Sequence, residues 1–213
     1  YNFFKAKNYG EALPAFREAG QALRTSSNKD ITNKLQPDAQ MRTGDCYFKQ
    51  NKYKEAIAAY NEVINKKQIG YQYALFQNGI ILGLTGEVND KITAMRSIIN
   101  DKSSSEYVDD ALLELGITYL NLNQPAQAKT ALTQLVNEYG NRSNLVIEAL
   151  LKLGLVHYNQ GDFTNALSYY KNVFKYNPEP NESQEALSAI EEIYIQDLGK
   201  PDEYFAFLET IPG

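Results

Sequence analysis

The most regular part of the chain is the stretch of residues 149–174, which reads ALLKLGLVHYNQGDFTNALSYYKNVF. Apolar residues recur at helical spacing as far as His157, residues 160–162 (Gln-Gly-Asp) interrupt them, and they resume at Phe163. Pro178 then ends the second run, because proline cannot continue a helix. Two helices joined by three residues must lie side by side, so this stretch predicts a pair of antiparallel helices.

The pair recurs along the chain with four landmarks. Each copy has a glycine, an aromatic or other large residue three positions later, a small residue twelve positions later, and a large apolar residue sixteen positions later. The copies are Gly44, Tyr47, Ala56 and Tyr60; Gly79, Leu82, Lys91 and Met95; Gly116, Tyr119, Ala128 and Leu132; and Gly154, His157, Ala166 and Tyr170. Small residues let two helix backbones approach closely, and the large residues fill the space beside them.

This periodicity predicts the fold class. One helix pair buries only one of its faces and needs a neighbour on each side, so the pairs stack as an array. We expect an all-α, right-handed superhelical solenoid of antiparallel helix pairs with about five repeats, forming one unit over residues 1–213. Its expected parts are a partial first repeat at 1–24, a polar insertion at 25–36, repeats near 37–69, 70–104, 105–142 and 143–180, and a degenerate last pair at 181–213.

Composition excludes several classes of function. The net charge is −5, from 21 Lys and Arg against 26 Asp and Glu, so we expect no nucleic-acid partner. The longest apolar run, residues 79–84, is far shorter than the roughly 20 residues that span a bilayer. Cys46 is the only cysteine, which excludes an internal disulfide and a thiolate metal site. We therefore expect no membrane span, no metal and no cofactor.

The landmarks resemble those of tetratricopeptide repeats. The resemblance rests on the Leu-Gly-x-x-His pattern that begins at Leu153, the Asn-Lys-Tyr and Gly-Asp-Phe turns at 51–53 and 161–163, and Asn-Pro at 177–178, and it covers nearly the whole chain. Tryptophan is absent, and the glycine spacing exceeds the usual 34 residues. The added residues near 103–111 and 139–143 look like those of the bacterial envelope subgroup, which includes the Tol-Pal-associated protein and an outer-membrane assembly lipoprotein.

The resemblance implies both a location and a function. It implies a periplasmic or outer-membrane-associated protein, and the ending at residues 201–213 looks like an internal stretch of a long repeat protein of the Bacteroidetes type, so we expect a fragment. It also implies a non-catalytic scaffold in cell-envelope assembly that binds a peptide or protein through its concave face. In the family geometry that face is lined by Met41, Asp45, Phe48, Phe76, Ile80, Gly83, Leu113, Ile117, Leu120, Leu151, Leu155 and Tyr158.

Other interpretations stay open at this point. The apolar residues of the expected groove could instead be internal packing. The repeats could be the accessory region of an enzyme or glycan-binding protein, or a spacer that self-associates into a homo-oligomer. His157 stands where two other copies have tyrosine, and Cys46 lies two residues after the landmark Gly44, so we expect packing roles for both. The acidic pairs at 109–110 and 191–192 are expected to be solvated, because adjacent helical residues point apart.

Overall fold

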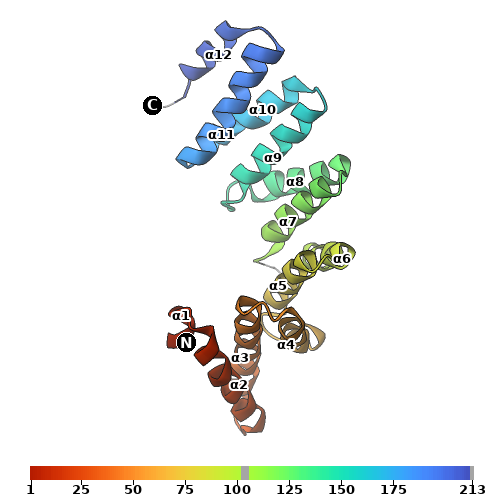
Figure 1. Cartoon of the computed structure of the whole chain (residues 1–213), viewed down its shortest axis with the longest axis vertical. Helices are drawn as coiled ribbons and strands as arrows, with labels where there is room; N and C mark the ends of the chain where they lie inside the picture. The colour runs from red at the N-terminus through yellow and green to blue at the C-terminus, as the bar shows by residue number, and fades with distance from the viewer. Residues whose placement is uncertain (102–105, 212–213) are drawn as a thin grey trace. The chain divides into compact units, whose positions relative to one another are not determined.

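The computed structural model describes residues 1–101 and 106–211, and across these residues it is built from helices with no β-strand (Figure 1). The all-α prediction is confirmed. None of the helices in the described ranges has the length and hydrophobicity that a membrane span requires. The elements are α1 (Asn2–Lys5), α2 (Tyr9–Thr25), α3 (Lys29–Lys49), α4 (Tyr53–Asn65), α5 (Tyr71–Leu84), α6 (Val88–Ile99), α7 (Val108–Asn121), α8 (Pro125–Tyr139), α9 (Val146–Asn159), α10 (Phe163–Val173), η1 (Phe174–Tyr176), α11 (Pro180–Glu191), η2 (Glu192–Asp197) and α12 (Pro201–Leu208).

The chain groups into two compact units. Unit 1 is Tyr1–Ala111 and unit 2 is Leu112–Gly213, with the boundary inside α7. Within them the helices alternate between first helices (α3, α5, α7, α9, and α11 continued by η2) and second helices (α4, α6, α8, α10 and α12). The expectation that the whole chain is one solenoid unit stays a prediction.

The turn inside each pair has one repeated backbone feature. The residue seven positions after the landmark glycine adopts a left-handed conformation, with φ of 58° at Asn51, 87° at Gly86, 54° at Asn123 and 71° at Gly161. Glycine has no Cβ to clash in this region, and asparagine tolerates it better than other residues do. The alternation of Asn and Gly at this position therefore fixes the reversal between first and second helix.

The landmark glycines lie where the two helices touch. A Cβ placed on Gly44 would lie 2.6 Å from the ring of Tyr60, and one on Gly116 would lie 2.5 Å from Leu132. Any side chain here would displace the large residue opposite. In the other two copies, a Cβ placed on Gly79 would lie 2.5 Å from Met95, and one placed on Gly154 would lie 2.6 Å from the ring of Tyr170. The spacing of sixteen residues read from the sequence thus corresponds to a direct contact in every copy.

One copy departs from the pattern and is compensated. Ala56, Ala128 and Ala166 are fully buried, whereas the equivalent residue of the second copy is Lys91. Gly83 faces this lysine across the pair, and a Cβ on it would lie 2.8 Å from the Lys91 Cδ. The positions equivalent to Gly83 hold Phe48, Leu120 and Tyr158. The missing side chain at Gly83 therefore makes room for the longer one at Lys91.

The last pair lacks both small landmarks. Gly199 has the left-handed turn conformation, with φ of 63°, and counting back seven residues places Glu192 where the other copies have glycine. The same register places Tyr204 where they have a small residue. The regular helix α11 ends at Glu191, and the chain continues as the π-helical segment η2. A glutamate in the glycine place cannot lie between nested helices, and Glu192 is exposed.

The polar stretch at 25–36 lengthens a helix. Asn28 caps α3, its side chain accepting a hydrogen bond from the Ile31 backbone N–H at 3.2 Å. As a result α3 has 21 residues, against 13 in its partner α4. The Thr32 hydroxyl also donates to the Leu23 carbonyl at 3.1 Å, which ties the added turns of α3 to α2.

Candidate functional site

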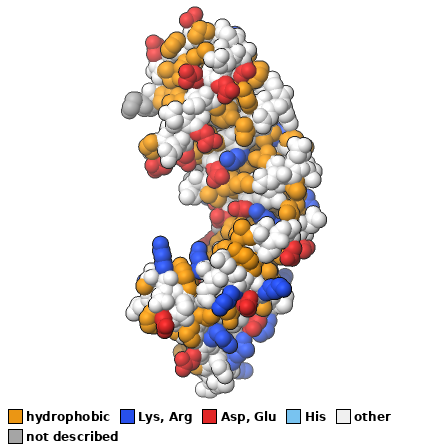
Figure 2. Space-filling model, in the orientation of Figure 1, with side chains coloured by type: hydrophobic (Ala, Val, Ile, Leu, Met, Phe, Trp, Pro, Cys, Tyr) orange, Lys and Arg blue, Asp and Glu red, His pale blue; other side chains and the backbone are white. Residues whose placement is uncertain are grey.

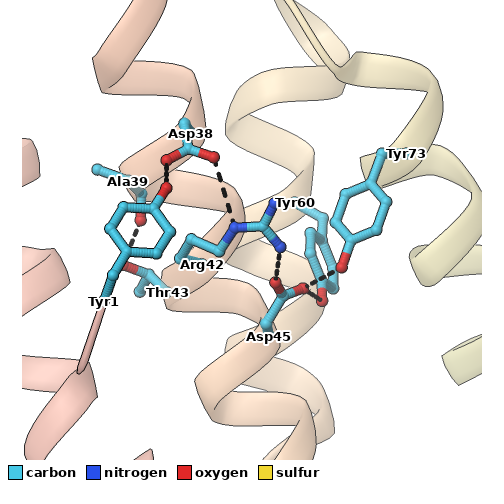
Figure 3. A network of polar contacts seen from close by, with 8 residues as sticks. All are labelled: Tyr1, Asp38, Ala39, Arg42, Thr43, Asp45, Tyr60 and Tyr73. Carbon is cyan, nitrogen blue, oxygen red and sulfur yellow. Dashed lines mark hydrogen bonds and ion pairs between the residues drawn. The ribbon is translucent and has the colours of Figure 1, made fainter. Parts of the chain in front are cut away.

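A buried carboxylate joins three helices of unit 1 (Figure 3). Asp45 in α3 is only 5% exposed. Its Oδ1 accepts hydrogen bonds from the hydroxyls of Tyr60 in α4 and Tyr73 in α5, both at 2.7 Å, and its Oδ2 accepts one from Arg42 at 2.6 Å. Three donors, one of them charged, satisfy the carboxylate. Asp45 therefore joins two first helices, α3 and α5, to the second helix α4.

Arg42 is the cation of this network. Its Nε lies 3.4 Å from Asp38, which also accepts a hydrogen bond from the Tyr1 hydroxyl. The guanidinium carbon lies 5.4 Å from the ring centroid of Tyr73 and 6.0 Å from that of Phe4, within the range of cation–π attraction. Burial by itself would lower the pKa of Arg42, but the neighbouring carboxylates, Asp45 above all, raise it. The side chain is 27% exposed, so a permanent positive charge reaches solvent here.

Three neighbours of this ion pair, Tyr60, Tyr73 and Cys46, have raised pKa values. Burial and the charge of Asp45 raise the pKa of the Tyr60 and Tyr73 hydroxyls. The same two causes raise the pKa of the Cys46 thiol to about 11. Cys46 is fully buried and packs with Phe16 of α2, as its expected packing role requires. The Tyr60 and Tyr73 hydroxyls and the Cys46 thiol therefore stay protonated near neutral pH.

A cavity of about 350 Å³ opens beside Arg42, on the side of unit 1 that is formed by its first helices. The ring of Tyr107 forms one wall, with its centroid 5.8 Å from that of Tyr73 and stacked at 5.9 Å on Phe76. The cavity combines aromatic walls with a cation, an amide and a carboxylate. Its lining residues are Met41, Arg42, Gly70, Gln72, Tyr73, Glu106 and Tyr107. Such a mixture is suited to holding a side chain or a short segment of another molecule.

A larger cleft of about 660 Å³ lies between α2, α3 and α4. Its lining includes Arg17, Glu18 and Glu55, so charges of both signs face it. An ion pair of 2.5 Å between Arg24 and Glu62 spans it from α2 to α4. Exposed pairs of this kind contribute little to stability. Among the described residues, Tyr47 is the one aromatic residue in the lining of the cleft, against Tyr73 and Tyr107 in the smaller cavity.

The residues expected to line a groove fall into three groups. Four are buried at 4 to 7% exposure and contribute to packing: Met41, Asp45, Leu113 and Leu151. Seven are partly buried: Phe48, Phe76, Ile80, Gly83, Ile117, Leu120 and Tyr158. Leu155 alone among them is open to solvent, at 44%. Met41 lines the cavity of unit 1, Phe76 stacks on the Tyr107 ring that forms its wall, and Leu155 and Tyr158 lie together in α9. Binding through these residues stays a prediction.

His157 has a local structural role. Its Nδ1 lies 2.8 Å from the Asp162 carboxylate, and its ring stacks on Tyr169 with centroids 5.3 Å apart. Asp162 caps α10 and accepts hydrogen bonds from the side chain and backbone N–H of Asn165. The bonds from Asn165 and His157 lower the pKa of Asp162 to about 2. In the described ranges, no three His, Cys, Asp or Glu side chains gather as metal ligands would.

The prediction from sequence missed four residues that now stand out. Arg42, Tyr73 and Tyr107 form the cavity of unit 1, and Glu192 replaces the landmark glycine of the last pair. Tyr73 lies six residues before the landmark Gly79. The expected groove residues were taken from three other positions in each repeat, so Tyr73 was not among them. Glu192 could have been found by counting back from the turn at Gly199. No signal in the sequence marks Tyr107, which precedes the first residue of α7.

Helix pairs nested at small residues and joined by left-handed turns define an α-helical repeat protein. Three family models, each described as tetratricopeptide repeat, match residues 2–70, 110–142 and 147–180, which together make up more than half of the chain. The chain belongs to the tetratricopeptide repeat family. No curated protein matches the sequence closely enough to count as a relative.

Solved structures share this fold at low sequence identity. BtubC from P. vanneervenii aligns with a TM-score of 0.71 and 12% identity, over 94% of this chain and 88% of its own. The C-terminal part of a tetratricopeptide repeat protein from Cytophaga hutchinsonii aligns with a TM-score of 0.67 and 20% identity, over 97% and 75%. MamA aligns at 0.60 and 23%, over 78% and 90%. At these identities the likeness shows the solenoid fold alone.

Proposed function

We propose that this chain is a non-catalytic scaffold that binds a peptide or protein segment through the first-helix face, meaning the side of each unit formed by its first helices. The observation that carries the proposal is the cavity of about 350 Å³ in unit 1, which opens on that side of a tetratricopeptide repeat array. Its aromatic walls offer apolar contact area, and Arg42 offers a charge that Asp45 holds in place. Both features favour the capture of side chains from a partner.

The chemistry of the described residues supports binding over catalysis. The thiol of Cys46 is buried with a raised pKa, and His157 is engaged with Asp162 and Tyr169. Neither is placed to activate a substrate beside the cavity. The matching families and structures reported above are named for repeats or for individual proteins, and none is named for an enzymatic activity.

Affinity capture tests the scaffold function. The full chain is used as bait in extracts of the cells that produce it, as wild type and as the variants Phe76→Asp and Leu155→Asp, one in the first-helix face of each unit. Leu122→Asp is the matched control, because Leu122 is similarly exposed, at 40%, but lies at the turn after α7. We expect a specific partner that is lost with a face variant and kept with the control. Identical capture by all four folded proteins would contradict binding through this face.

The same cavity gives one reason to test a second function. Two tyrosine rings, an amide and a carboxylate, from Tyr73, Tyr107, Gln72 and Glu106, are side chains that also suit sugar rings. A glycan-binding accessory region would bind soluble oligosaccharides, and Tyr107→Ala would abolish that binding. Calorimetric titration with a panel of bacterial cell-wall and capsule oligosaccharides distinguishes it from the protein-binding function.

We further propose that the scaffold works in bacterial cell-envelope assembly, in the periplasm or at the outer membrane. Support comes from the resemblance of the lengthened repeats, near 103–111 and 139–143, to those of envelope proteins. Immunodetection in separated periplasmic, membrane and cytoplasmic fractions tests the location, and recovery in the cytoplasmic fraction alone would contradict it. Self-association stays a prediction, which light scattering over a range of protein concentrations tests.

A further inference from the structure

Helix α9 of unit 2 has an apolar side that the core does not use. Leu150, Leu153 and Val156 face the core, with at most 3% exposure. Leu155 is 44% exposed on the other side of the helix, and Tyr158 lies three residues further on, close enough in a helix to share its side. A leucine and a tyrosine therefore lie together on the first-helix face of unit 2, away from the packed interior.

Two carboxylates of the next first helix flank this tyrosine. The Tyr158 hydroxyl donates to Glu192 Oε1 at 3.0 Å. This bond is the main cause that raises the pKa of Tyr158 to about 12, and Asp197 contributes as well, so both acids of η2 lie beside the ring. No Lys or Arg in the described part of the chain forms an ion pair with Glu192 or Asp197. Their negative charge is therefore available to a cation from outside.

The π-helical segment explains why these acids face outward. Counted along the sequence, Glu192 holds the place of the glycine that touches the second helix in the other pairs. In the structure Glu191 is the acid that hydrogen-bonds Tyr204 of α12, and Glu192 is exposed at the start of η2. The π-helical spacing of hydrogen-bonded residues is five, which brings Glu192 and Asp197 to the same side of η2. Segments of this kind occur frequently at functional sites. The departure from the repeat pattern thus creates a pair of carboxylates beside an apolar side chain.

The charge of unit 2 favours a cationic partner. Residues 112–213 hold six Lys and Arg against thirteen Asp and Glu, whereas residues 1–111 hold fifteen against thirteen. Residues 179–209 alone carry nine acids and one lysine. Figure 2 shows these acidic side chains among hydrophobic ones over the C-terminal helices. A surface of one sign attracts segments of the opposite sign and raises their rate of association.

We propose that Leu155, Tyr158, Glu192 and Asp197 form an acidic-apolar face that binds a basic amphipathic helix of a partner protein. The apolar side of that helix packs on Leu155 and Tyr158, and its Lys or Arg residues pair with Glu192 and Asp197. This inference rests on the proposed scaffold function and specifies the chemistry of the partner at unit 2. It is independent of what the cavity of unit 1 holds.

Fluorescence anisotropy with the full chain tests the proposal. Three labelled peptides of about 18 residues, roughly five helical turns, serve as probes. One has Leu and Lys in an amphipathic pattern, one has Leu and Glu in the same pattern, and one has Ser in place of Leu with the same lysines. We expect only the Leu/Lys peptide to bind, and to bind more weakly at high salt because its ion pairs are screened.

Matched variants locate the binding. Replacing both acids, by Glu192→Gln with Asp197→Asn, should weaken the Leu/Lys peptide about 10-fold, from two lost exposed ion pairs. Leu155→Ser should weaken it by a similar factor, about 10-fold, through lost apolar contact. The control is Glu138→Gln with Glu209→Gln, which removes the same charge from exposed positions outside the acidic-apolar face and should change the affinity less than about 2-fold.

The outcomes separate this proposal from the scaffold function. Preference for the Leu/Glu peptide would overturn the proposed partner chemistry while supporting peptide binding as such. Equal binding of the Ser/Lys peptide, or equal weakening by the control variant, would show general attraction to an acidic protein and also overturn the proposal. Binding of none of the peptides would overturn it too, and would leave the scaffold function to be judged by partner capture.

Discussion

The substitution Gly44→Ala tests whether helix nesting depends on the landmark glycines. The new Cβ would lie 2.6 Å from Cε1 of Tyr60 and 2.8 Å from two further ring atoms. Tyr60 is fully buried, so its ring must move by about 0.8 Å to restore ordinary contact. Overpacking of this kind costs about 1–3 kcal/mol. Movement of the ring also strains the hydrogen bond from Tyr60 to Asp45, which contributes about 1 kcal/mol.

An opposing effect must be subtracted from that cost. Replacement of glycine by alanine inside a helix gains about 1 kcal/mol of helix propensity. The expected net result for Gly44→Ala is a loss of about 2 kcal/mol, which lowers the Tm by about 5 °C in a chain of this size. The matched control is Gly20→Ala in α2 of the same unit, where the new Cβ meets only Ala39 at an ordinary 3.8 Å.

Thermal and urea denaturation followed by circular dichroism at 222 nm measures both variants. We expect Gly20→Ala to gain about 0.5–1 kcal/mol in free energy of unfolding while Gly44→Ala loses about 2 kcal/mol. An equal gain in both variants would refute the reasoning, because it would mean that the glycine and the tyrosine ring do not touch in solution.

Three further predictions concern single side chains. Asp45→Asn leaves the partly buried Arg42 without its main counter-charge. We expect urea denaturation to show that the free energy of unfolding falls by about 3 kcal/mol. A fall of less than about 1 kcal/mol would mean that the ion pair is not formed. Cys46, with its pKa raised to about 11, should resist a chromogenic thiol reagent at pH 8 until urea unfolds the chain, and rapid reaction of the native protein would be inconsistent with burial. The folded pKa of Asp162, about 2, lies below the ordinary value of 3.8, so its stabilising effect is present above about pH 4 and disappears as the pH falls toward 2. Asp162→Ala should therefore lower the Tm at pH 7 and leave it nearly unchanged near pH 2, and a Tm difference that does not depend on pH would argue against this assignment.

Much of the fold could be read from the sequence because it rests on local rules. The small landmarks were expected to lie where the helices approach closely, with large residues beside them, and in the structure Gly116 lies against Leu132. The left-handed turns follow from Asn and Gly at one fixed distance from each landmark. The insertion at 25–36 shows the limit of this approach, since polar residues without strong apolar periodicity still formed the start of α3. Contacts with α2 stabilise that extension, and a single-helix pattern does not reveal them.

The candidate site was harder to predict because it depends on departures from the repeat. Asp45 was expected to face a groove, but its register does not show that Tyr60, Tyr73 and Arg42 converge on it and leave it buried. Whether a side chain such as Leu151 or Leu155 is covered depends on packing between pairs, and the two differ greatly in exposure although both are leucines of α9. Sequence spacing gives the side of a helix and not the degree of cover.

Site-specific photo-crosslinking tests the central claim most directly, namely that nested helix pairs leave the first-helix face for a protein partner. A photoreactive phenylalanine analogue is placed at Phe76 or Leu155 in first helices, and at Ala126 or Thr130, which are exposed on the second helix α8. The account predicts that the captured partner crosslinks from at least one first-helix position and from neither position in α8. Crosslinks from either position in α8 would contradict it.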